Sequence, residues 1–355
     1  MKLIHCADIH LGSALTSKLS KESSAKRKAE LRGAFKKLVD EASAMDVKNI
    51  LISGDLFDDD DPKTTDRDMF YKVVEDNADI DFYYLRGNHD IEKTLDVSYD
   101  NLKLFGNEWT KYYIDEGQHR IVICGIENDG KGNIYSDPGL DKNDLNIVML
   151  HGQAADSDGP NNIILKRFAG KNIDYLALGH VHSYFEGKLD DRGIYCYSGC
   201  LYGRGFDETG PKGYVLLDAS EKIESEFRIR PGKMIEELTV DITGTKNIYE
   251  ARKKISEETG ERSDNPLSLT VTGEREFDIE SLTDEIRDEI ASKRDSLHVS
   301  DATRRKYDLK DYVKNTSLTG EFVRTVLADK ELTDDEKSKI IEYGIAALKK
   351  EKLNW

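Results

Sequence analysis

The chain has 355 residues, of which 34% are charged, and its formal net charge at pH 7 is −17. This length exceeds a single typical hydrophobic core, so we expect two domains. The acidic balance argues against a protein that coats nucleic acid through a basic surface. The sequence contains no run of about 18 apolar, uncharged residues and therefore predicts no membrane span.

The N-terminus and the cysteines indicate a cytoplasmic protein. The chain enters a strand-like run at Lys2 and lacks the basic start and apolar core of a signal peptide. Its four cysteines form no CxxC pair; they are Cys6, Cys124, Cys196 and Cys200. We interpret them as reduced thiols, with a zinc knuckle as the alternative.

Strand-like runs and helical stretches alternate over residues 1–230, which predicts an α/β domain. Residues 21–46 predict an amphipathic helix, because apolar residues recur at spacings of three, four and seven. These residues are Leu31, Phe35, Leu38, Val39 and Ala42. A second helix is expected at 64–77, and further strands are expected at 184–189, 193–197 and 213–217. A Pro-Gly pair within 227–233 marks the expected domain boundary.

Residues 235–300 predict a smaller α/β capping domain. Its expected strands are 235–242 and 266–271, and its expected helices are 246–258 and 279–291.

Residues 303–355 predict a helical tail. The polar residues 303–316 are expected to connect it to the preceding domain, and two helices are expected from Gly320 onward. The break between these helices falls where Thr333 and Glu336 have the spacing of a capping box.

Five short motifs carry most of the chemistry-bearing side chains. They are Asp8-Ile9-His10, Gly54-Asp55, Gly87-Asn88-His89-Asp90, His151-Gly152 and Gly179-His180-Val181-His182. An apolar run precedes each motif, as is typical of a buried strand. The motifs are therefore expected on loops just beyond strand ends, where α/β folds place their chemistry. Their glycines would let the backbone turn sharply beside a ligand.

This order of carboxylate, imidazole and amide groups predicts a two-metal centre that hydrolyses a phosphate ester. Two cations roughly 3.5–4 Å apart can acidify a water molecule and neutralise both the attacking and the leaving oxygen. We expect Asp55 to bridge the cations. The expected ligands of one cation are Asp8, His10 and His182, and those of the other are Asn88, His151 and His180. Such mixed ligands suit manganese, iron or zinc better than calcium.

The remaining histidines have other expected roles. His89 follows a predicted ligand directly, so we expect its side chain to contact the phosphate and protonate the leaving oxygen. Asp90 would orient the ring of His89 and raise its basicity. His5 is interpreted as a core residue, and His119 and His298 as surface or packing residues.

A glycine-rich segment at 202–212 carries two basic side chains, Arg204 and Lys212, in an acidic chain. Backbone amides and a guanidinium can hold phosphates without reading bases, so both residues are candidate phosphate contacts. The alternative is a structural β-turn that closes the second sheet. The acidic run at 58–61 is interpreted as the solvated start of a loop.

These motifs resemble the calcineurin-like metallophosphoesterase superfamily, whose fold is a two-sheet α/β sandwich with a dimetal centre. Asp8-x-His10-Leu11-Gly12 and Gly54-Asp55-Leu56-Phe57-Asp58 with Pro62 are similar to the SbcD-type DNA repair nuclease subunits and their YhaO-like relatives. The segment 197–214 is similar to one that these nucleases carry after the last metal histidines. The motif match covers residues 1–217, whereas residues 235–300 resemble the nuclease capping domain only in element order.

The resemblance supports the ligand roles given above and His89 as the phosphate-contacting catalytic residue. It implies a manganese-dependent DNA exonuclease and single-strand endonuclease that works as a homodimer in DNA end processing, repair and recombination. It also implies an SMC-like coiled-coil ATPase partner, SbcC-like or YhaN-like, which would supply the grip on DNA that this acidic chain lacks. Some family members have a histidine where Asp58 stands, so the role of that histidine is not transferred.

Two other functions stay open from the sequence. One is a small-substrate phosphoesterase that acts on cyclic nucleotides or phosphoproteins with the same centre. The other is a binding scaffold with a vestigial metal site, against which the complete ligand set argues. Within the tail, residues 320–355 are predicted to dock the ATPase, because apolar residues recur there at helical spacing. Packing of the tail on this chain's own domain is the alternative.

Overall fold

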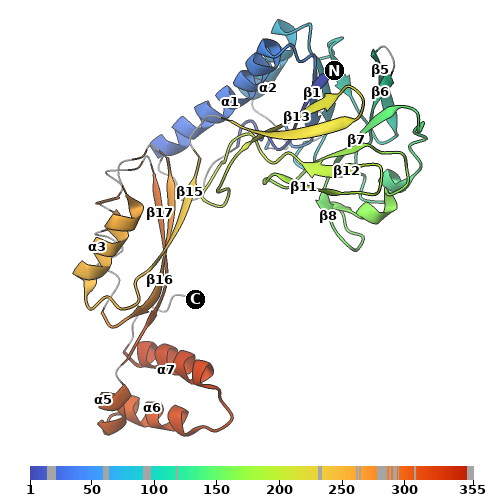
Figure 1. Cartoon of the computed structure of the whole chain (residues 1–355). Helices are drawn as coiled ribbons and strands as arrows, with labels where there is room; N and C mark the ends of the chain where they lie inside the picture. The colour runs from blue at the N-terminus through green and yellow to red at the C-terminus, as the bar shows by residue number, and fades with distance from the viewer. Residues whose placement is uncertain are drawn as a thin grey trace. The chain divides into compact units, whose positions relative to one another are not determined.

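The computed structural model describes residues 1–13, 21–58, 64–90, 97–116, 119–230, 234–260, 263, 265–277, 286–287, 289–290, 294, 296–307 and 309–349. Backbone contacts divide the chain into two units, Met1–Glu236 and Glu237–Trp355 (Figure 1). Each unit is described by itself below. The finer boundaries expected at 230–235 and 300–303 stay predictions.

Two six-stranded sheets form the first unit (Figure 1). The first has the order β14-β13-β1-β2-β3-β4, with β1 Lys2–Cys6, β2 Asn49–Ser53, β3 Asp81–Leu85, β4 Leu102–Leu104, β13 Gly213–Ala219 and β14 Ile223–Ile229. The second has the order β11-β12-β10-β7-β6-β5, with β5 Thr110–Glu116, β6 His119–Gly125, β7 Leu145–His151, β10 Tyr175–Gly179, β11 Phe185–Lys188 and β12 Ile194–Tyr197. Short elements complete the unit: β8 Gln153–Ala154, β9 Asn162–Ile163, and 3-10 turns at Asn133–Tyr135 and Leu165–Arg167. The predicted two-sheet α/β sandwich is confirmed.

The central strands are buried along their whole length, as their continuous apolar runs predict. All five residues of β2 and β10 and all seven of β7 are buried. Side chains of both sheets meet in a core between them, among them Leu51, Tyr83, Met149 and Tyr175. Because β1, β2 and β3 run parallel to one another, as do β7 and β10, their carboxyl ends share one edge of each sheet.

Two helices, α1 (Lys21–Ala44) and α2 (Thr64–Asp76), cover the other face of the first sheet. Phe35 and Phe70 pack there with Ile52 and Tyr84, whose side chains point away from those of their strand neighbours in the core between the sheets. All five apolar residues predicted to define the first helix are buried, which confirms that prediction. The helix ends at Ala44, two residues before the expected end.

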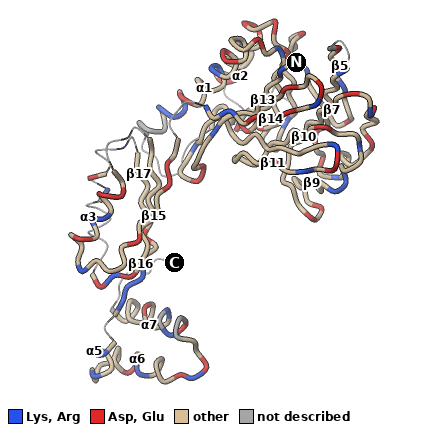
Figure 2. The backbone as a smooth tube through the Cα atoms, in the orientation of Figure 1, with Lys and Arg blue, Asp and Glu red and all other residues tan. Residues whose placement is uncertain are grey.

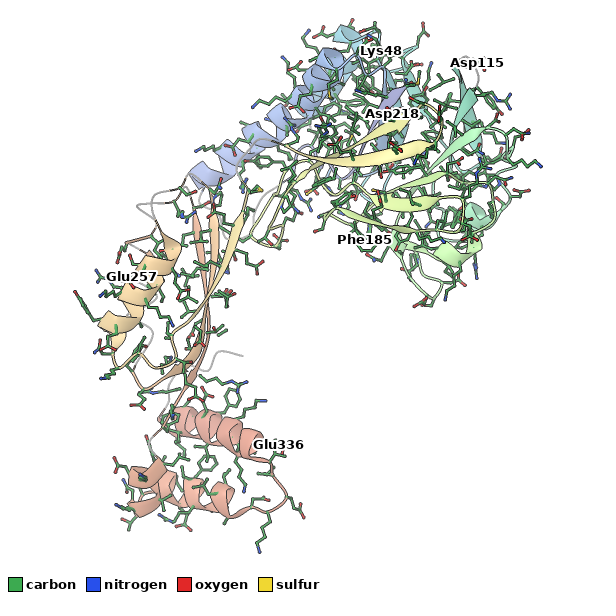
Figure 3. All side chains as sticks on the ribbon, viewed as in Figure 1. Lys48, Asp115, Phe185, Asp218, Glu257 and Glu336 are labelled. Atoms are coloured by element: carbon green, nitrogen blue, oxygen red, sulfur yellow. The ribbon has the colours of Figure 1, made fainter. Side chains whose placement is uncertain are left out.

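The second unit contains a three-stranded sheet of order β15-β16-β17, and α3 packs against it. Its elements are β15 Glu236–Asp241, β16 Leu267–Arg275, β17 Leu297–Arg305 and α3 Ile248–Thr259. Ala251 and Ile255 of α3 are buried, whereas Glu257 projects from its opposite side (Figure 3). Ile286 and Ile290 lie in the same core, but most of the helix expected at 279–291 falls outside the described residues.

The polar connection expected at 303–316 is wrong. β17 continues to Arg305, and a helix, α5, spans Leu309–Lys314. β17 pairs with β16 alone and lies at the edge of its sheet. An edge strand tolerates polar side chains, and so β17 lacks the apolar run that marks the central strands.

The C-terminal helices pack on one another. α6 (Leu318–Ala328) and α7 (Asp334–Lys349) bury Val323, Val326, Ile341 and Ile345 in a small core of their own. The predicted capping box before α7 is confirmed: the Thr333 backbone N–H donates to Glu336 Oε2 at 2.8 Å, and the Glu336 N–H donates to Thr333 Oγ1 at 3.3 Å.

Acidic and basic side chains are interspersed along the elements of both units (Figure 2). Among the described residues, no helix combines the length and apolar character that crossing a membrane requires.

Candidate dimetal centre

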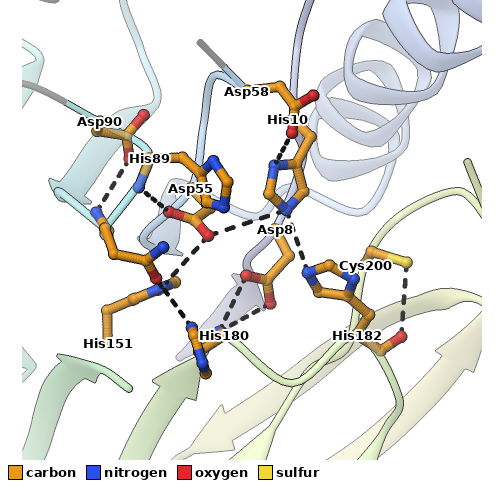
Figure 4. A network of polar contacts seen from close by, with 12 residues as sticks. Asp8, His10, Asp55, Asp58, His89, Asp90, His151, His180, His182 and Cys200 are labelled. Carbon is orange, nitrogen blue, oxygen red and sulfur yellow. Dashed lines mark hydrogen bonds and ion pairs between the residues drawn. The ribbon is translucent and has the colours of Figure 1, made fainter. Parts of the chain in front are cut away.

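The predicted ligands converge at the shared carboxyl ends of the parallel strands (Figure 4). The first sheet supplies two of the motifs. Asp8 and His10 follow β1, and Asp55 follows the neighbouring strand β2. The second sheet supplies His151 at the end of β7, where it pairs in register with Gly179 at the end of β10. Segments up to 172 residues apart in the sequence therefore meet at one place, as the sequence predicted.

Backbone hydrogen bonds tie the ligand loops to one another. The Asp8 N–H donates to the Gly54 carbonyl at 3.0 Å, and the His10 N–H donates to the Asp55 carbonyl at 3.0 Å. The His180 N–H donates to both carboxylate oxygens of Asp8, at 2.9 and 3.1 Å. These hydrogen bonds tie the ligand loops of the two sheets to each other.

Four of the expected ligands have a left-handed backbone. The φ angles are 51° at Asp8, 50° at His10, 50° at Asp55 and 95° at His180. Each such conformation costs a non-glycine residue on the order of 1–3 kcal/mol, and strain of this kind concentrates at functional sites. Among the described residues, only two other non-glycine positions have positive φ. The strain is therefore gathered at the centre.

Two glycines are required because other atoms of the chain occupy the space of a side chain. A Cβ atom at Gly87 would lie 2.1 Å from Asp55 Oδ1, and one at Gly179 would lie 1.9 Å from the Ser53 carbonyl oxygen. Neither glycine has positive φ. The sequence correctly placed glycines beside the ligands, but here the reason is close approach and not backbone freedom.

One group of ligand atoms comprises Asp8, His10 and His182, whose potential ligand atoms all lie within 4.8 Å of one another. His10 Nε2 and His182 Nε2 face each other at 3.2 Å. Asp8 and His10 are fully buried, whereas His182 is half-buried. This is the set that the sequence predicted for one cation.

A second group comprises Asp55, His151 and His180, again within 4.8 Å of one another. The Asn88 side-chain oxygen joins it, 3.1 Å from His151 Nε2 and 2.9 Å from His180 Nδ1. Asp55 lies between the two groups, with Oδ2 at 3.3 Å from His151 Nε2 and 3.9 Å from His10 Nε2. Its position suits a carboxylate shared by two cations.

The donor chemistry fits cations. His10 Nδ1 lies 2.8 Å from Asp58 Oδ1, and His182 Nδ1 lies 2.7 Å from Glu208 Oε1. If Nδ1 carries the proton in each ring, both Nε2 atoms present lone pairs to each other across 3.2 Å. Two ligand atoms at right angles on an ion with bonds of about 2.1 Å lie about 3 Å apart. The spacing is that of neighbouring ligands on one ion.

Electrostatics in the second group point the same way. Burial alone would raise the pKa of Asp55, but the hydrogen bond and charge of His151 and the charge of His10 hold it well below the usual value. Burial opposes a charged His151, yet the hydrogen bond and charge of Asp55, with the charge of Asp8, raise its pKa to about 9. The pocket thus favours positive charge, which is what a bound cation would supply.

Sequence reasoning missed Asp58 and Glu208. Asp58 itself is not solvated as expected: its carboxylate contacts His10 and accepts from Arg204 Nη1 at 2.7 Å. The rest of the acidic run, residues 59–61, lies outside the described residues. Glu208 is buried and holds His182, and Arg204 holds Glu208 through Nε at 2.9 Å and Nη2 at 2.7 Å. A carboxylate four residues after an arginine in the glycine-rich segment was the available signal for Glu208.

Arg204 and Lys212 each already contact groups of the protein, so their expected contact with a phosphate stays a prediction. Arg204 donates to Glu208 and Asp58. Lys212 is buried, and its Nζ donates to the His182 carbonyl oxygen at 2.8 Å. Both side chains therefore position His182 and its neighbours.

His89 is exposed, its ring centre lies 5.3 Å from that of His10, and its backbone N–H donates to Asp55 Oδ1 at 3.0 Å. The expected contact of Asp90 with the His89 ring is not among the contacts of the described residues. Asp90 is buried and accepts instead from three backbone N–H groups, those of Leu56, Phe57 and Gly87. The Asp90 carboxylate therefore links the loop that follows Asp55 to the loop that carries Asn88.

Residues that the sequence placed outside the centre lie elsewhere. His5 is buried, and its Nδ1 lies 2.9 Å from the Tyr175 hydroxyl. His298 is half-buried and lies 3.0 Å from Ser300 Oγ, whereas the side chain of His119 is outside the described residues. The four cysteines are buried and free, as expected for reduced thiols.

A recess of about 240 Å³ opens beside the second group. Asn88, His151, Asn107 and Asn161 form part of its lining. Arg86 and Glu127, joined by two hydrogen bonds of 2.6 and 2.5 Å, form another part. A polar recess beside a dimetal centre can receive part of a phosphate ester.

Comparison with protein families gives a match to the family described as calcineurin-like phosphoesterase, over residues 1–184. Two curated relatives are each 27% identical to the chain. One is the Bacillus subtilis protein described as uncharacterized metallophosphoesterase YhaO, matched over 70% of this chain and 65% of its own length. The other is the DNA double-strand break repair protein Mre11 of Saccharolobus solfataricus, matched over 78% of this chain and 76% of its own length. Both relatives support the narrower resemblance drawn from the motifs.

Among solved structures, a dimetal phosphatase from Danio rerio is similar over 62% of this chain and 93% of its own, with 10% identity and a TM-score of 0.38.

Proposed function

Because this chain belongs to the calcineurin-like phosphoesterase family, we propose that it is a metal-dependent DNA exonuclease and single-strand endonuclease. The observation that carries the proposal is the pair of ligand groups: the buried Asp55 carboxylate belongs to the second group and lies 3.9 Å from His10 Nε2 of the first. One such group would be enough for a single cation. Two groups with a shared carboxylate can hold two cations, which stabilise the attacking and the leaving oxygen of a phosphoryl transfer.

When bound, two cations would acidify a water molecule and neutralise the charge of the phosphate between them. The residues that would hold them are Asp8, His10 and His182 on one side and Asn88, His151 and His180 on the other, with Asp55 shared. His89 is exposed beside the first group, where its imidazole can hold a proton for the leaving oxygen. Manganese is the proposed metal because the resemblance to the nuclease subunits implies it; the mix of imidazole, carboxylate and amide oxygen suits iron and zinc as well.

DNA as the substrate is supported by the relative named for double-strand break repair and by the motif resemblance. The net charge of −17 means that this chain alone has little general attraction for DNA. We therefore propose that an SMC-like coiled-coil ATPase, SbcC-like or YhaN-like, supplies the grip on DNA. From the resemblance we also propose that the chain forms a homodimer and works in DNA end processing, repair and recombination. The free, buried cysteines support a cytoplasmic location.

The C-terminal helices are the proposed docking surface for that ATPase. Part of the predicted apolar set is used within the tail, since Val323 and Ile345 are fully buried. Other members stay on the surface: Leu327 and Ile340 are each 37% exposed and Leu348 is 41% exposed. These exposed side chains are the part of the tail that a partner helix pair could cover.

The test compares purified protein with Mn²⁺ on labelled single-stranded DNA, blunt duplex DNA and a small phosphodiester. Asp55→Asn is the matched inactive control, because it removes one bridging charge while keeping the size of the side chain. The proposal predicts cleavage of DNA by the wild type and loss of all hydrolysis in the variant. Residual activity above about a tenth of wild type would exclude Asp55 as the bridge, since a loss of one essential charge exceeds about 1.4 kcal/mol.

A small phosphodiester or phosphomonoester is the second candidate substrate. The recess beside Asn88 and His151, of about 240 Å³, favours it, because such a volume suits part of a small molecule. Faster turnover of the small phosphodiester than of any DNA in the same assay would select this function.

A further inference from the structure

A second, larger cavity lies between α1 and the segment that follows β12, wholly within the first unit. Its volume is about 420 Å³, within the range of about 300–1,000 Å³ that small-molecule sites occupy. None of the expected metal ligands lines this cavity. Its lining residues come from α1, residues 201–203, Lys212, Arg230 and Met234.

The charge of this cavity is opposite to that of the chain. Four basic residues line it, Lys26, Lys37, Lys212 and Arg230, against one acidic lining residue, Glu30. Arg230 also donates to the Ala34 carbonyl and lies 3.6 Å from the Glu41 carboxylate, which is outside the lining. Glu30 already accepts a hydrogen bond from the Tyr202 hydroxyl. In a chain of net charge −17, this concentration of positive charge selects for an anion.

Two of these cations are buried. Lys212 and Arg230 are each 7% exposed, and Arg230 Nε has no hydrogen-bond partner. Burial lowers the pKa of Arg230, although the charges of Glu41 and Tyr214 oppose this. A buried guanidinium with an unmet donor is costly, and an anion in the cavity would satisfy it.

The rest of the lining is apolar. Ala34 and Leu201 are buried, and the Tyr202 ring lies 5.0 Å from the guanidinium carbon of Arg27. Gly33 leaves the helix side of the cavity open, since a Cβ atom added there would meet no atom within 4 Å. The cavity therefore offers apolar surface next to positive charge, which suits a ligand with an apolar body and an anionic end.

The same segment holds the metal ligand His182. Lys212 lines the cavity with part of its side chain and donates from Nζ to the His182 carbonyl. Gly203 lines the cavity and precedes Arg204, whose backbone N–H and side chain fix Glu208. These contacts connect the wall of the cavity to the groups that support His182.

We propose that this cavity binds a small organophosphate, a phosphate joined to an apolar body as in a mononucleotide, and that its occupancy alters metal binding at His182. The site is separate from the metal centre. The inference does not depend on DNA being the substrate, because it rests on the cavity and its contacts to His182.

Calorimetry on the full chain tests the binding. Metal is first removed with EDTA so that the centre cannot hold a phosphate. The probes are adenosine monophosphate, adenosine and inorganic phosphate. Adenosine monophosphate is expected to bind at least about tenfold more tightly than either of the others, because only it supplies both an anion and an apolar body. Equal binding of inorganic phosphate would reduce the site to a general anion contact and overturn the proposed ligand class.

Matched variants of α1 locate the binding. Lys37 lines the cavity and its neighbour Lys36 does not, although both are exposed on the same helix. Lys37→Glu is expected to weaken binding of adenosine monophosphate at least about tenfold, and Lys36→Glu less than about twofold. Gly33→Leu fills the open space and should abolish binding, whereas Lys36→Leu should not. Equal binding by Gly33→Leu and wild type would overturn the proposal.

The coupling has its own measurement. Mn²⁺ is titrated into the protein, with metal occupancy followed by calorimetry, with and without adenosine monophosphate. The nucleotide is expected to change the Mn²⁺ affinity several-fold in wild type and in Lys36→Leu, and to leave it unchanged in Gly33→Leu. A change that persists in Gly33→Leu would mean that the nucleotide acts at the metal centre itself, which contradicts the coupling. Absent nuclease activity would leave these binding results intact and would count against the proposed function alone.

Discussion

Glu208→Gln separates the support of the metal centre from its ligands. Glu208 Oε1 lies 2.7 Å from His182 Nδ1 and 2.7 Å from Arg204 Nη2, and the residue is buried. Glutamine keeps the size of the side chain but loses its charge. Its amide nitrogen is a donor and cannot accept from His182 Nδ1 or Arg204 Nη2, which both contact Glu208 Oε1. We expect Mn²⁺ affinity and turnover to fall by about 10–100-fold, the usual effect of losing a carboxylate that orients a metal-bound histidine.

The same substitution affects folding. Arg204 retains Asp58 as a partner but loses a buried charge-assisted contact, so we expect unfolding free energy to fall by about 1–3 kcal/mol in the metal-free protein. Mn²⁺ calorimetry, hydrolysis of a small phosphodiester and urea unfolding measure the three quantities. Glu226→Gln is the control: it removes an exposed partner of Arg228, a surface pair worth about 0–1 kcal/mol. Metal affinity within about twofold of wild type in Glu208→Gln would refute the assigned role of Glu208.

Three further predictions address the centre and the tail. His89→Gln should keep two Mn²⁺ ions but lose about 10²–10⁴ in rate, and loss of one metal equivalent on elemental analysis would make His89 a ligand. Gly87→Ala should lose Mn²⁺ binding, because the added Cβ would lie 2.1 Å from Asp55 Oδ1; normal metal content by calorimetry would show that the loop can move. Removing residues 309–355 should leave the melting of the first unit and cleavage of single-stranded DNA unchanged but abolish co-purification of the ATPase. The tail has a separate hydrophobic core that includes Val323 and Ile345. Aggregation or a much lower melting temperature after its removal would show that the rest of the chain needs the tail to fold.

The strands and the ligand groups could be predicted because their signals are local. A buried central strand needs an unbroken apolar run, and β2 and β7 have one. The turns that follow the strands need residues that fit their geometry. Gly87 allows the close approach of Asp55, and Asp55 itself adopts a positive φ angle. Parallel strands then bring their carboxyl ends together, which places the ligands without further information.

The support of the ligands could not be predicted because it depends on contacts between distant segments. Asp58 lies at the start of an acidic run, and only the fold brings Arg204, 146 residues later, against it. Asp90 has the right sequence position to orient His89, but three backbone N–H groups of two loops claim its carboxylate. β17 lacked a signal because an edge strand can be polar.

The metal content of the centre tests the central claim most directly. Crystals of the protein soaked in Mn²⁺ would be measured at the manganese absorption edge, where anomalous scattering locates each ion. The account predicts two ions roughly 3.5–4 Å apart, one beside His10 and His182 and one beside Asn88 and His151, with Asp55 contacting both. A single ion, or two ions without Asp55 between them, would contradict it.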